Sequence, residues 1–317
     1  MLHKKKSLLK IFNSLQTFQS NKKAIVTIGT FDGVHIGHQK ILLKLLQISK
    51  SENCESVVLT FFPHPRMVLQ HDNTIKLLNT LEEKVKLLEQ LGIDNLIIHP
   101  FDQEFSQLSA EDFVKSILVD QLNVQKIVIG YDHRFGKNRT ADISDLIRFG
   151  LHYNFEIEQI SVEEINDIAV SSTKIRNALT EGEIETATNY LGYNYTLTGE
   201  VVKGKQLGRT IGFPTANIVI NEAYKLIPKK GVYIVSSMIE KQLVYGIMNI
   251  GNRPTLNGDT QTIEVHFLDF NKDIYNQTIE IVFLKYIREE AKFNSLDDLK
   301  TQITKDQSFA VDYIANL

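Results

Sequence analysis

The architecture of the N-terminal half follows from one stretch, Ala24-Ile25-Val26-Thr27-Ile28-Gly29-Thr30-Phe31-Asp32-Gly33-Val34-His35-Ile36-Gly37-His38. Its first five residues are apolar or β-branched and predict a buried strand, and the apolar spacing from Gln39 to Ser49 predicts a helix. The glycine-rich segment between them predicts a tight turn. Such a strand-to-helix turn directs unpaired backbone N–H groups and the positive end of the helix dipole at one point, which favours a phosphate site.

Strand-like and helical patterns alternate on the C-terminal side of this stretch. We expect strands at 57–61, 96–98 and 126–129 and helices at 81–91 and 113–122. This β-α-β alternation predicts a parallel sheet covered by helices, with ligands beyond the carboxyl ends of the strands. Residues 1–20, which begin with a lysine-rich segment, are expected to form an amphipathic helix.

The pattern changes after about residue 190. Strand-like segments follow one another with few helices between them, at 197–202, 231–236, 243–250, 262–268 and 278–287. This spacing is typical of an antiparallel barrel or sandwich, and Ser295 begins a capping pattern for a last helix. We therefore expect an α/β, Rossmann-like domain at 1–188, followed by an antiparallel β-barrel domain with a C-terminal helix at 189–317.

Composition narrows the classes of protein. The 317 residues are 43% hydrophobic, enough for a sizeable core, and the formal net charge of -3 predicts no general attraction to nucleic acid or to an anionic membrane. The single cysteine excludes an intramolecular disulfide and a multi-cysteine zinc site, which suits a reducing, cytoplasmic location. No segment approaches the roughly 18 to 20 uninterrupted apolar residues that a membrane-spanning helix needs.

Two histidines in the first turn are candidate catalytic residues. His35 and His38 lie three residues apart, so they can face the same side and donate hydrogen bonds to phosphate oxygens as charge builds in a transition state. Gly33 and Gly37 let the backbone approach a ligand closely. Two other interpretations exist, because the histidines could be structural residues at a helix start or half of a metal site.

The first turn resembles the His-x-Gly-His signature of the nucleotidyltransferase superfamily. The longer run 29–38 is similar to that of bacterial bifunctional riboflavin kinase/FMN adenylyltransferases, or FAD synthetases. The resemblance implies that ATP donates AMP without a covalent enzyme intermediate. The ATP-binding residues that it implies in this stretch are Gly29, Phe31, Asp32, Gly33, His35 and His38.

Three further segments resemble the same family. Residues 170–176 resemble its Ser-Ser-Thr-x-x-Arg motif, which implies that Ser172, Thr173 and a catalytic Arg176 engage the triphosphate; alone, the segment would be an ordinary N-cap with a solvated arginine. Segments 61–66 and 130–136 are similar to family segments of the nucleotide and flavin region. They add Asp132 for ATP, and Pro63, His64 and Phe135 near the flavin. His133 stands where the family often has phenylalanine.

The second half has its own glycine-rich segment, Gly204-Lys205-Gln206-Leu207-Gly208-Arg209-Thr210-Ile211-Gly212-Phe213-Pro214-Thr215-Ala216-Asn217. It is not a P-loop, but glycine-rich loops expose backbone donors to phosphates. Thr215 and Asn217 alternate, so their hard oxygen atoms can face the same way and suit Mg²⁺ carried by a nucleotide. The segment resembles the flavokinase signature Gly-Arg-x-x-Gly-Phe-Pro-Thr-Ala-Asn. The ATP-binding residues implied are Gly204, Lys205, Gly208, Arg209, Gly212, Pro214, Thr215 and Asn217.

Two more residues follow from the resemblance to flavokinases. Glu264 lies in a segment that resembles Glu-Val-His-x-x-Asp-Phe, whose glutamate acts as general base on the ribityl 5′-hydroxyl; a lone strand carboxylate is otherwise usually a solvated surface residue. Arg288 lies in a segment that resembles one near the flavin.

Together the resemblances imply a bifunctional transferase. It would phosphorylate riboflavin to FMN with MgATP and adenylylate FMN to FAD with release of pyrophosphate, so that FMN and FAD are substrate and product and not redox cofactors. ATP, riboflavin and FMN are the expected partners. Two alternatives are a nucleotidyltransferase for another acceptor and a flavin-binding module without catalysis.

Overall fold

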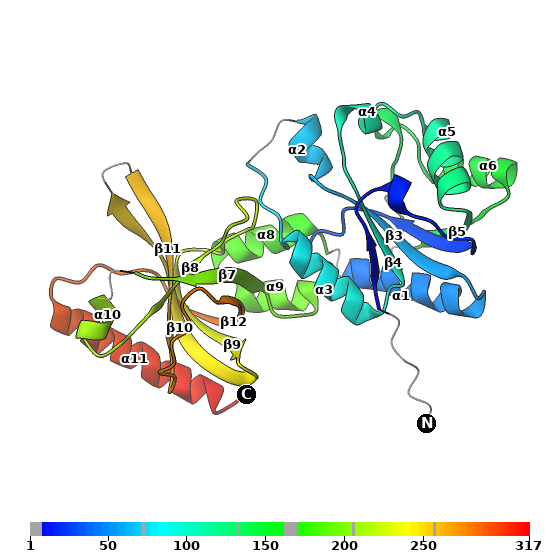
Figure 1. The fold of residues 1–317 in the computed structure, drawn as a ribbon. Helices are drawn as coiled ribbons and strands as arrows, with labels where there is room; N and C mark the ends of the chain where they lie inside the picture. The colour runs from blue at the N-terminus through cyan, green and yellow to red at the C-terminus, as the bar shows by residue number, and fades with distance from the viewer. Residues whose placement is uncertain (1–7, 71–73, 132, 162–169, 205–206, 256–257) are drawn as a thin grey trace, which may run out of the picture. The chain divides into compact units, whose positions relative to one another are not determined.

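The structure divides at the start of helix α8 into two units, residues 1–172 and 173–317 (Figure 1). The computed structural model describes residues 8–70, 74–131, 133–161, 170–204, 207–255 and 258–317. Asp132 and Lys205, both expected to bind ATP, lie outside the described residues. Most of α8 and all of α9 group with the second unit, and the expected functional boundary near residue 188 stays a prediction.

A parallel sheet forms the centre of the first unit. Its six strands within the described residues have the order β1-β4-β3-β2-β5-β6, and every neighbouring pair is parallel. The strands are β1 (Lys10–Phe12), β2 (Ala24–Ile28), β3 (Glu55–Phe61), β4 (Asn95–His99), β5 (Val124–Gly130) and β6 (Glu156–Ile160). Because the chain continues from β2 to β3 on one side and reaches β5 on the other, the carboxyl end of β2 is the topological switch point where such sheets bind ligands.

Helices connect the strands of this unit. They are α1 (Ile36–Ser51), α2 (Pro65–Leu69), α3 (Leu81–Leu91), α4 (Gln103–Ser106), α5 (Ala110–Asp112), the π-helical segment Phe113–Gln121 and α6 (Ile143–Tyr153). Two 3-10 turns, Leu15–Thr17 and Lys137–Arg139, complete the unit. The expected strands and the helix at 81–91 are confirmed, and α1 begins three residues earlier than the apolar spacing indicated.

Both faces of the sheet are covered at its centre, which explains why β2 to β5 are mainly apolar, whereas the edge strands β1 and β6 carry exposed charged residues. Alternate strand residues point to opposite faces, so Ile25 packs with α1 and α3 whereas Val26 packs with the π-helical segment and α6. The same alternation holds in β3, where Val57 and Val58 belong to different clusters. The two helical layers are visible on either side of the strands in Figure 1.

The expected amphipathic helix over residues 1–20 is wrong for the part that the structure describes. Lys10–Phe12 forms β1, which pairs in parallel with β4, and the Lys10 N–H donates to the Asp94 carbonyl oxygen. The Phe12 ring packs edge-on against Phe18, 5.1 Å between centroids. Pairing with a strand more than eighty residues away therefore overrides the local helical pattern.

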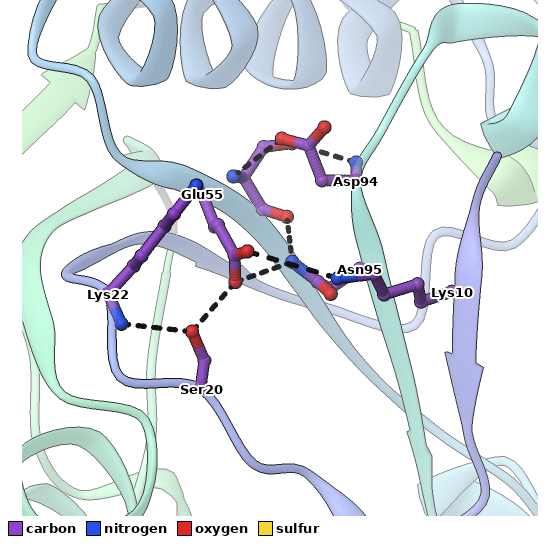
Figure 2. Close-up of polar contacts among 7 residues, drawn as sticks. Lys10, Ser20, Lys22, Glu55, Asp94 and Asn95 are labelled. Atoms are coloured by element: carbon purple, nitrogen blue, oxygen red, sulfur yellow. Dashed lines mark hydrogen bonds and ion pairs between the residues drawn. The ribbon is translucent and has the colours of Figure 1, made fainter. Parts of the chain in front are cut away.

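A polar network joins the amino ends of β3 and β4, at the edge of the sheet opposite the switch point (Figure 2). Asp94 accepts from the Ser56 backbone N–H and hydroxyl, and Ser56 Oγ accepts from the Asp94 N–H. Glu55 accepts from Ser20 Oγ at 2.9 Å and from Asn95 Nδ2 at 3.3 Å. These hydrogen bonds give the polar groups of the buried Asn95 and Ser56 side chains their partners, so we interpret the network as structural.

A closed barrel forms the second unit. Its strands follow the order β10-β11-β8-β7-β12-β9, with antiparallel neighbours throughout the described pairings. They are β7 (Thr196–Val202), β8 (Ala216–Val219), β9 (Gly231–Ile239), β10 (Gln242–Thr255), β11 (Gly258–Phe267) and β12 (Thr278–Arg288). The expected barrel is confirmed, but β8 was missed: its four residues lie at the end of the glycine-rich segment.

Four helices accompany the barrel, namely α8 (Ser172–Glu181), α9 (Ile184–Leu191), α10 (Leu207–Thr210) and α11 (Leu296–Ile314). The expected last helix is confirmed, because Ser295 Oγ accepts from the Asp298 N–H at its first turn. Ala310 of α11 packs against Val232, Ile234 and Ile247 of the barrel. Among the described residues, no helix is both long and apolar enough to span a membrane.

Candidate active sites

The first candidate site is the turn between β2 and α1, at the switch point of the parallel sheet. It contains all six residues that the first stretch contributed to the expected ATP site, namely Gly29, Phe31, Asp32, Gly33, His35 and His38. Phe31 and Val34 have positive φ angles of 46° and 37°, a conformation that side-chain-bearing residues rarely adopt. Such strained backbone persists only where surrounding contacts fix it, and it is common at functional sites.

The two histidines lie together at the N-terminus of α1. His35 is the N-cap residue, and its Nδ1 accepts from the His38 backbone N–H at 3.3 Å. The rings are stacked, with 3.6 Å between centroids and 17° between planes. Because an accepting Nδ1 carries no proton, His35 is assigned as the neutral tautomer with its proton on Nε2. The histidines are thus confirmed as neighbours, and one of them is also a helix cap.

His38 is surrounded by groups that oppose its protonation. The pKa of His38 is held well below the ordinary histidine value of 6.5, first by burial and then by electrostatic interaction with the neighbouring ionisable groups His35 and Lys84. Its Nδ1 is buried and has no hydrogen-bond partner among the described residues. His38 is therefore a neutral imidazole near pH 7, able to donate a hydrogen bond from Nε2.

Asp32 and Ser172 hold the turn from two sides. The Asp32 side chain is buried, and its Oδ1 accepts from the Leu78 backbone N–H at 2.9 Å. Ser172 Oγ donates to the Asp32 carbonyl oxygen at 2.9 Å, so the structure brings the expected Ser172 to the first turn. Thr173 and Arg176 follow in the first turns of α8.

The residues expected near the flavin follow the two strands that flank β2. Pro63 and His64 follow β3, and His64 caps α2 by accepting from the Arg66 N–H at 3.2 Å. Phe135 follows β5 and is buried. The His133 ring stacks on Phe135 with 6.1 Å between centroids, so the histidine occupies an aromatic stacking position. All of these residues lie at the carboxyl edge of the sheet.

The second candidate site is the glycine-rich loop that enters β8. A Cβ atom on Gly204 would lie 2.2 Å from Asn217 Nδ2, and one on Gly208 would lie 2.2 Å from the Phe213 carbonyl oxygen. Backbone packing therefore requires glycine at Gly208, whereas a side chain at Gly204 would displace the Asn217 amide. Gly208 also receives a hydrogen bond from the Phe213 N–H at 2.8 Å, which closes the loop around the short helix α10. Arg209, Gly212 and Pro214 lie in the same loop.

Strand pairing brings the other expected residues of this site together. Glu264 of β11 pairs with Asn217 of β8 on one side and with Asn249 of β10 on the other. Thr215 Oγ1 donates to Glu264 Oε2 at 3.4 Å, and His266 Nδ1 lies 2.8 Å from the Pro214 carbonyl oxygen. A carboxylate thus lies beside one hydroxyl and two amides, an oxygen-rich set.

This donor set fits Mg²⁺ better than a softer metal. Thr215 and Asn217 supply neutral oxygens beside the Glu264 carboxylate, and hard oxygen ligands are those that Mg²⁺ prefers. No group of three or more His, Cys, Asp or Glu side chains suited to a metal ion occurs in the part of the chain that the structure describes. The histidine pair of the first turn is accordingly no part of such a group there.

Arg288 ends β12 and is fixed by the C-terminal helix. Its Nε donates to Asp306 Oδ1 at 3.0 Å and its Nη2 to Asp306 Oδ2 at 2.8 Å, and Asp306 is buried. Gln302 Nε2 donates to the same carboxylate at 2.9 Å. The guanidinium lies 5.9 Å from the centre of the Phe293 ring. The pair therefore fixes the segment that follows β12.

Sequence reasoning missed two residues, Lys84 and Asp306. Lys84 is buried in α3, and its Nζ donates to the Thr30 carbonyl oxygen of the first turn at 2.7 Å. Asp306 is the partner of Arg288. Both occur where the helical period predicts apolar residues: Lys84 follows Leu81 by three positions, and Asp306 follows Ile303 by three. A charged residue on an apolar helix face was the available signal.

The two sites define a class of protein. A histidine-bearing turn at the switch point of a parallel sheet, and a separate barrel with a carboxylate beside a glycine-rich loop, are the parts of a two-domain phosphate-transferring enzyme. Comparisons with known proteins narrow the class. The family model for FAD synthetase matches residues 17–174, and the one for riboflavin kinase matches residues 191–314.

Whole-chain relatives carry both activities in their names. The chain is 40% identical to the bifunctional riboflavin kinase/FMN adenylyltransferase of Buchnera aphidicola subsp. Schizaphis graminum over 94% of this chain and 96% of the relative. It is 39% identical to the enzyme of that name from Listeria monocytogenes, over 92% and 93%. The crystal structure of a protein named macrolide-efflux protein, from Streptococcus pneumoniae, matches with a TM-score of 0.87 and 29% identity over 96% and 98%. The chain belongs to the bifunctional riboflavin kinase/FMN adenylyltransferase family.

Proposed function

We propose that the second unit phosphorylates riboflavin to FMN with MgATP, and that the first unit transfers AMP from ATP to FMN, which yields FAD and pyrophosphate. The observation that carries this proposal is that each unit contains one of the two glycine-rich signature segments of the sequence, and that each segment lies within the matching family model. FMN is then the product of one site and the substrate of the other.

In the first unit, adenylyl transfer needs positioning and charge stabilisation more than covalent chemistry. A phosphate oxygen of FMN attacks the α-phosphorus of ATP, and the bond to the β-phosphate breaks to release pyrophosphate. His35 and His38 donate hydrogen bonds from Nε2 to the phosphates, and Ser172 adds its hydroxyl. The motif that Ser172 begins gives Thr173 and Arg176 a role toward the triphosphate as well. The position of both histidines at the N-terminus of α1 supports this donor role, because the helix dipole there also attracts the negative charge of the phosphates. Pro63, His64 and Phe135 contact the flavin, and Asp132 the nucleotide.

In the second unit, Glu264 accepts the proton of the ribityl 5′-hydroxyl while that oxygen attacks the γ-phosphorus and ADP leaves. Thr215 and Asn217 would hold Mg²⁺ with the nucleotide, and the ion supplies charge neutralisation when bound. Gly204, Lys205, Gly208, Arg209, Gly212 and Pro214 enclose the phosphates. Arg288 lies near the flavin. The position of Glu264 beside Thr215 and Asn217 supports this assignment. We also propose a cytoplasmic location, which the single free Cys54 suits.

Two reciprocal variants test the division of labour. His38→Ala should abolish FAD formation from FMN and leave riboflavin phosphorylation intact. Glu264→Gln should slow FMN formation by about 10²- to 10⁴-fold, the usual contribution of a general base, and leave FMN adenylylation intact. Both half-reactions are measured on each preparation by separating riboflavin, FMN and FAD. If either variant impairs both reactions equally, or neither, its residue does not have the proposed role.

A further inference from the structure

Lys84 is a buried cation directly beneath the first turn. Lys84 is only 5% exposed, and its Nζ donates to the Thr30 carbonyl oxygen at 2.7 Å. Lysine is almost never buried this deeply unless a partner compensates its charge. The pKa of Lys84 is lowered because burial disfavours the charge, although the Asp32 carboxylate acts in the opposite direction.

The position of Lys84 in α3 makes its charge still less favourable. α3 begins at Leu81 with a capping box between Thr80 and Glu83, so Lys84 lies in the first turn, where the helix dipole opposes a positive charge. Its neighbours on the same face include the buried Leu88. A methionine or leucine would fill this place without those costs. Packing alone therefore does not explain the lysine.

The contacts of Lys84 all lead to the phosphate-binding turn. The Thr30 carbonyl oxygen accepts from Lys84 Nζ and also from Thr60 Oγ1 at 3.3 Å, so two side chains fix the orientation of this peptide. The strained residue Phe31 comes next, and its ring contacts His38 edge-on at 5.2 Å. Lys84 thus acts on the turn through the backbone and on His38 through its charge.

We propose that Lys84 is a positioning residue of adenylyl transfer, which fixes the Thr30 peptide and places a buried positive charge beside His38. This inference rests on the proposed function of the first unit. It explains how two neutral histidines can serve a highly anionic substrate: the imidazoles supply directed hydrogen bonds, and the lysine supplies charge that solvent does not screen. Direct contact between Lys84 and the substrate is not required.

The charge of Lys84 has a defined effect on the protonation of His38. In the part of the chain that the structure describes, the ionisable groups that act on His38 are His35 from the turn and Lys84 from α3, and Asp32 acts in turn on Lys84. A positive charge disfavours the imidazolium, so Lys84 contributes to the lowered pKa of His38. Removing the charge should therefore raise the pKa of His38.

The test compares Lys84→Gln with Lys84→Met in the full chain, and with Lys86→Gln as the matched control on an exposed position of the same helix. The glutamine removes the charge and keeps an N–H donor on a side chain one bond shorter, whereas the methionine removes both the charge and the donor. We measure kcat and KM for FMN adenylylation across pH, riboflavin phosphorylation as an internal control, and the pKa of His38 by NMR with labelled histidine. The His38→Gln spectrum assigns the resonance.

Both Lys84 variants should reduce kcat for FAD formation by about 10- to 100-fold, since a misplacement of about 1 Å at a reacting centre can cost on the order of 100-fold. The pKa of His38 should rise, and riboflavin phosphorylation should match Lys86→Gln. A folded Lys84→Gln protein with wild-type FAD formation and an unchanged His38 pKa would overturn the proposal. Absence of FAD synthesis by the wild-type chain would instead refute the proposed function.

Discussion

His35 has two roles that a pair of substitutions can separate. Its Nδ1 caps α1 by accepting from the His38 N–H at 3.3 Å, and we assign the donor role toward phosphate to Nε2. Asparagine has its Oδ1 on the same Cγ position as the histidine Nδ1 and is among the best N-cap residues. His35→Asn therefore keeps the cap and loses the distal donor, whereas His35→Ala loses both.

The expected magnitudes follow from this geometry. Loss of an N-cap acceptor costs about 0.5 to 2 kcal/mol of folding stability, so the alanine variant should be less stable than the asparagine variant by about 1 kcal/mol. Both variants lose the stacked ring contact with His38, so this loss cancels in the comparison. Removing one preorganised donor from a transition state costs about 10²- to 10³-fold in rate. FAD formation should therefore fall by that factor in both.

Two measurements decide the matter. Urea unfolding followed by circular dichroism gives the stability difference between the variants, and conversion of FMN to FAD gives the rate. Riboflavin phosphorylation on the same preparation controls for the amount of folded enzyme. If His35→Asn makes FAD as fast as the wild type, the histidine is only a helix cap and the donor role is refuted.

Three further predictions concern other parts of the chain. The pKa of His38 in the folded chain lies below the ordinary value of 6.5, so the unfolded chain binds more protons in mild acid. The folding stability should therefore fall as pH drops below about 6.5, and His38→Gln should reduce this loss in unfolding titrations. Asp306→Asn should destabilise the barrel by about 1 to 3 kcal/mol and slow FMN formation, because it leaves the Arg288 guanidinium without its carboxylate. The Arg288 side chain is 23% exposed, which limits this cost, and an unchanged stability would contradict the pairing. A fragment of residues 173–317 should fold and phosphorylate riboflavin. A fragment of residues 189–317 should be less stable because it lacks α8 and most of α9, and equal melting temperatures of the two fragments would disprove this difference.

The sequence was sufficient for the elements whose signals are local. The apolar run of β2, the spacing of α3 and the cap at Ser295 each predicted its element because neighbouring residues determine it. Both glycine-rich segments could be recognised because each is one continuous stretch, and their roles as phosphate sites stay predictions. Placement of the histidines beside each other follows directly from their spacing at the start of α1.

Other features depend on partners that are distant in sequence. β8 has only four residues and is a strand because β7 and β11 pair with it on either side, which no local pattern records. Lys84 and Asp306 do not stand out in the sequence, because charged residues are usually solvated. Their burial depends on the Thr30 carbonyl and on Arg288, contacts that exist only after the chain has folded.

The shortest strand of the sheet has a consequence for solubility. β1 contributes three residues, and it covers the outer edge of β4, whose five residues are all buried. Without β1, the N–H and C=O groups along an apolar strand would be open to pairing with another chain, which is the usual start of edge-to-edge aggregation. A truncation that removes residues 8–20 should therefore increase self-association, although no residue of either candidate site is lost.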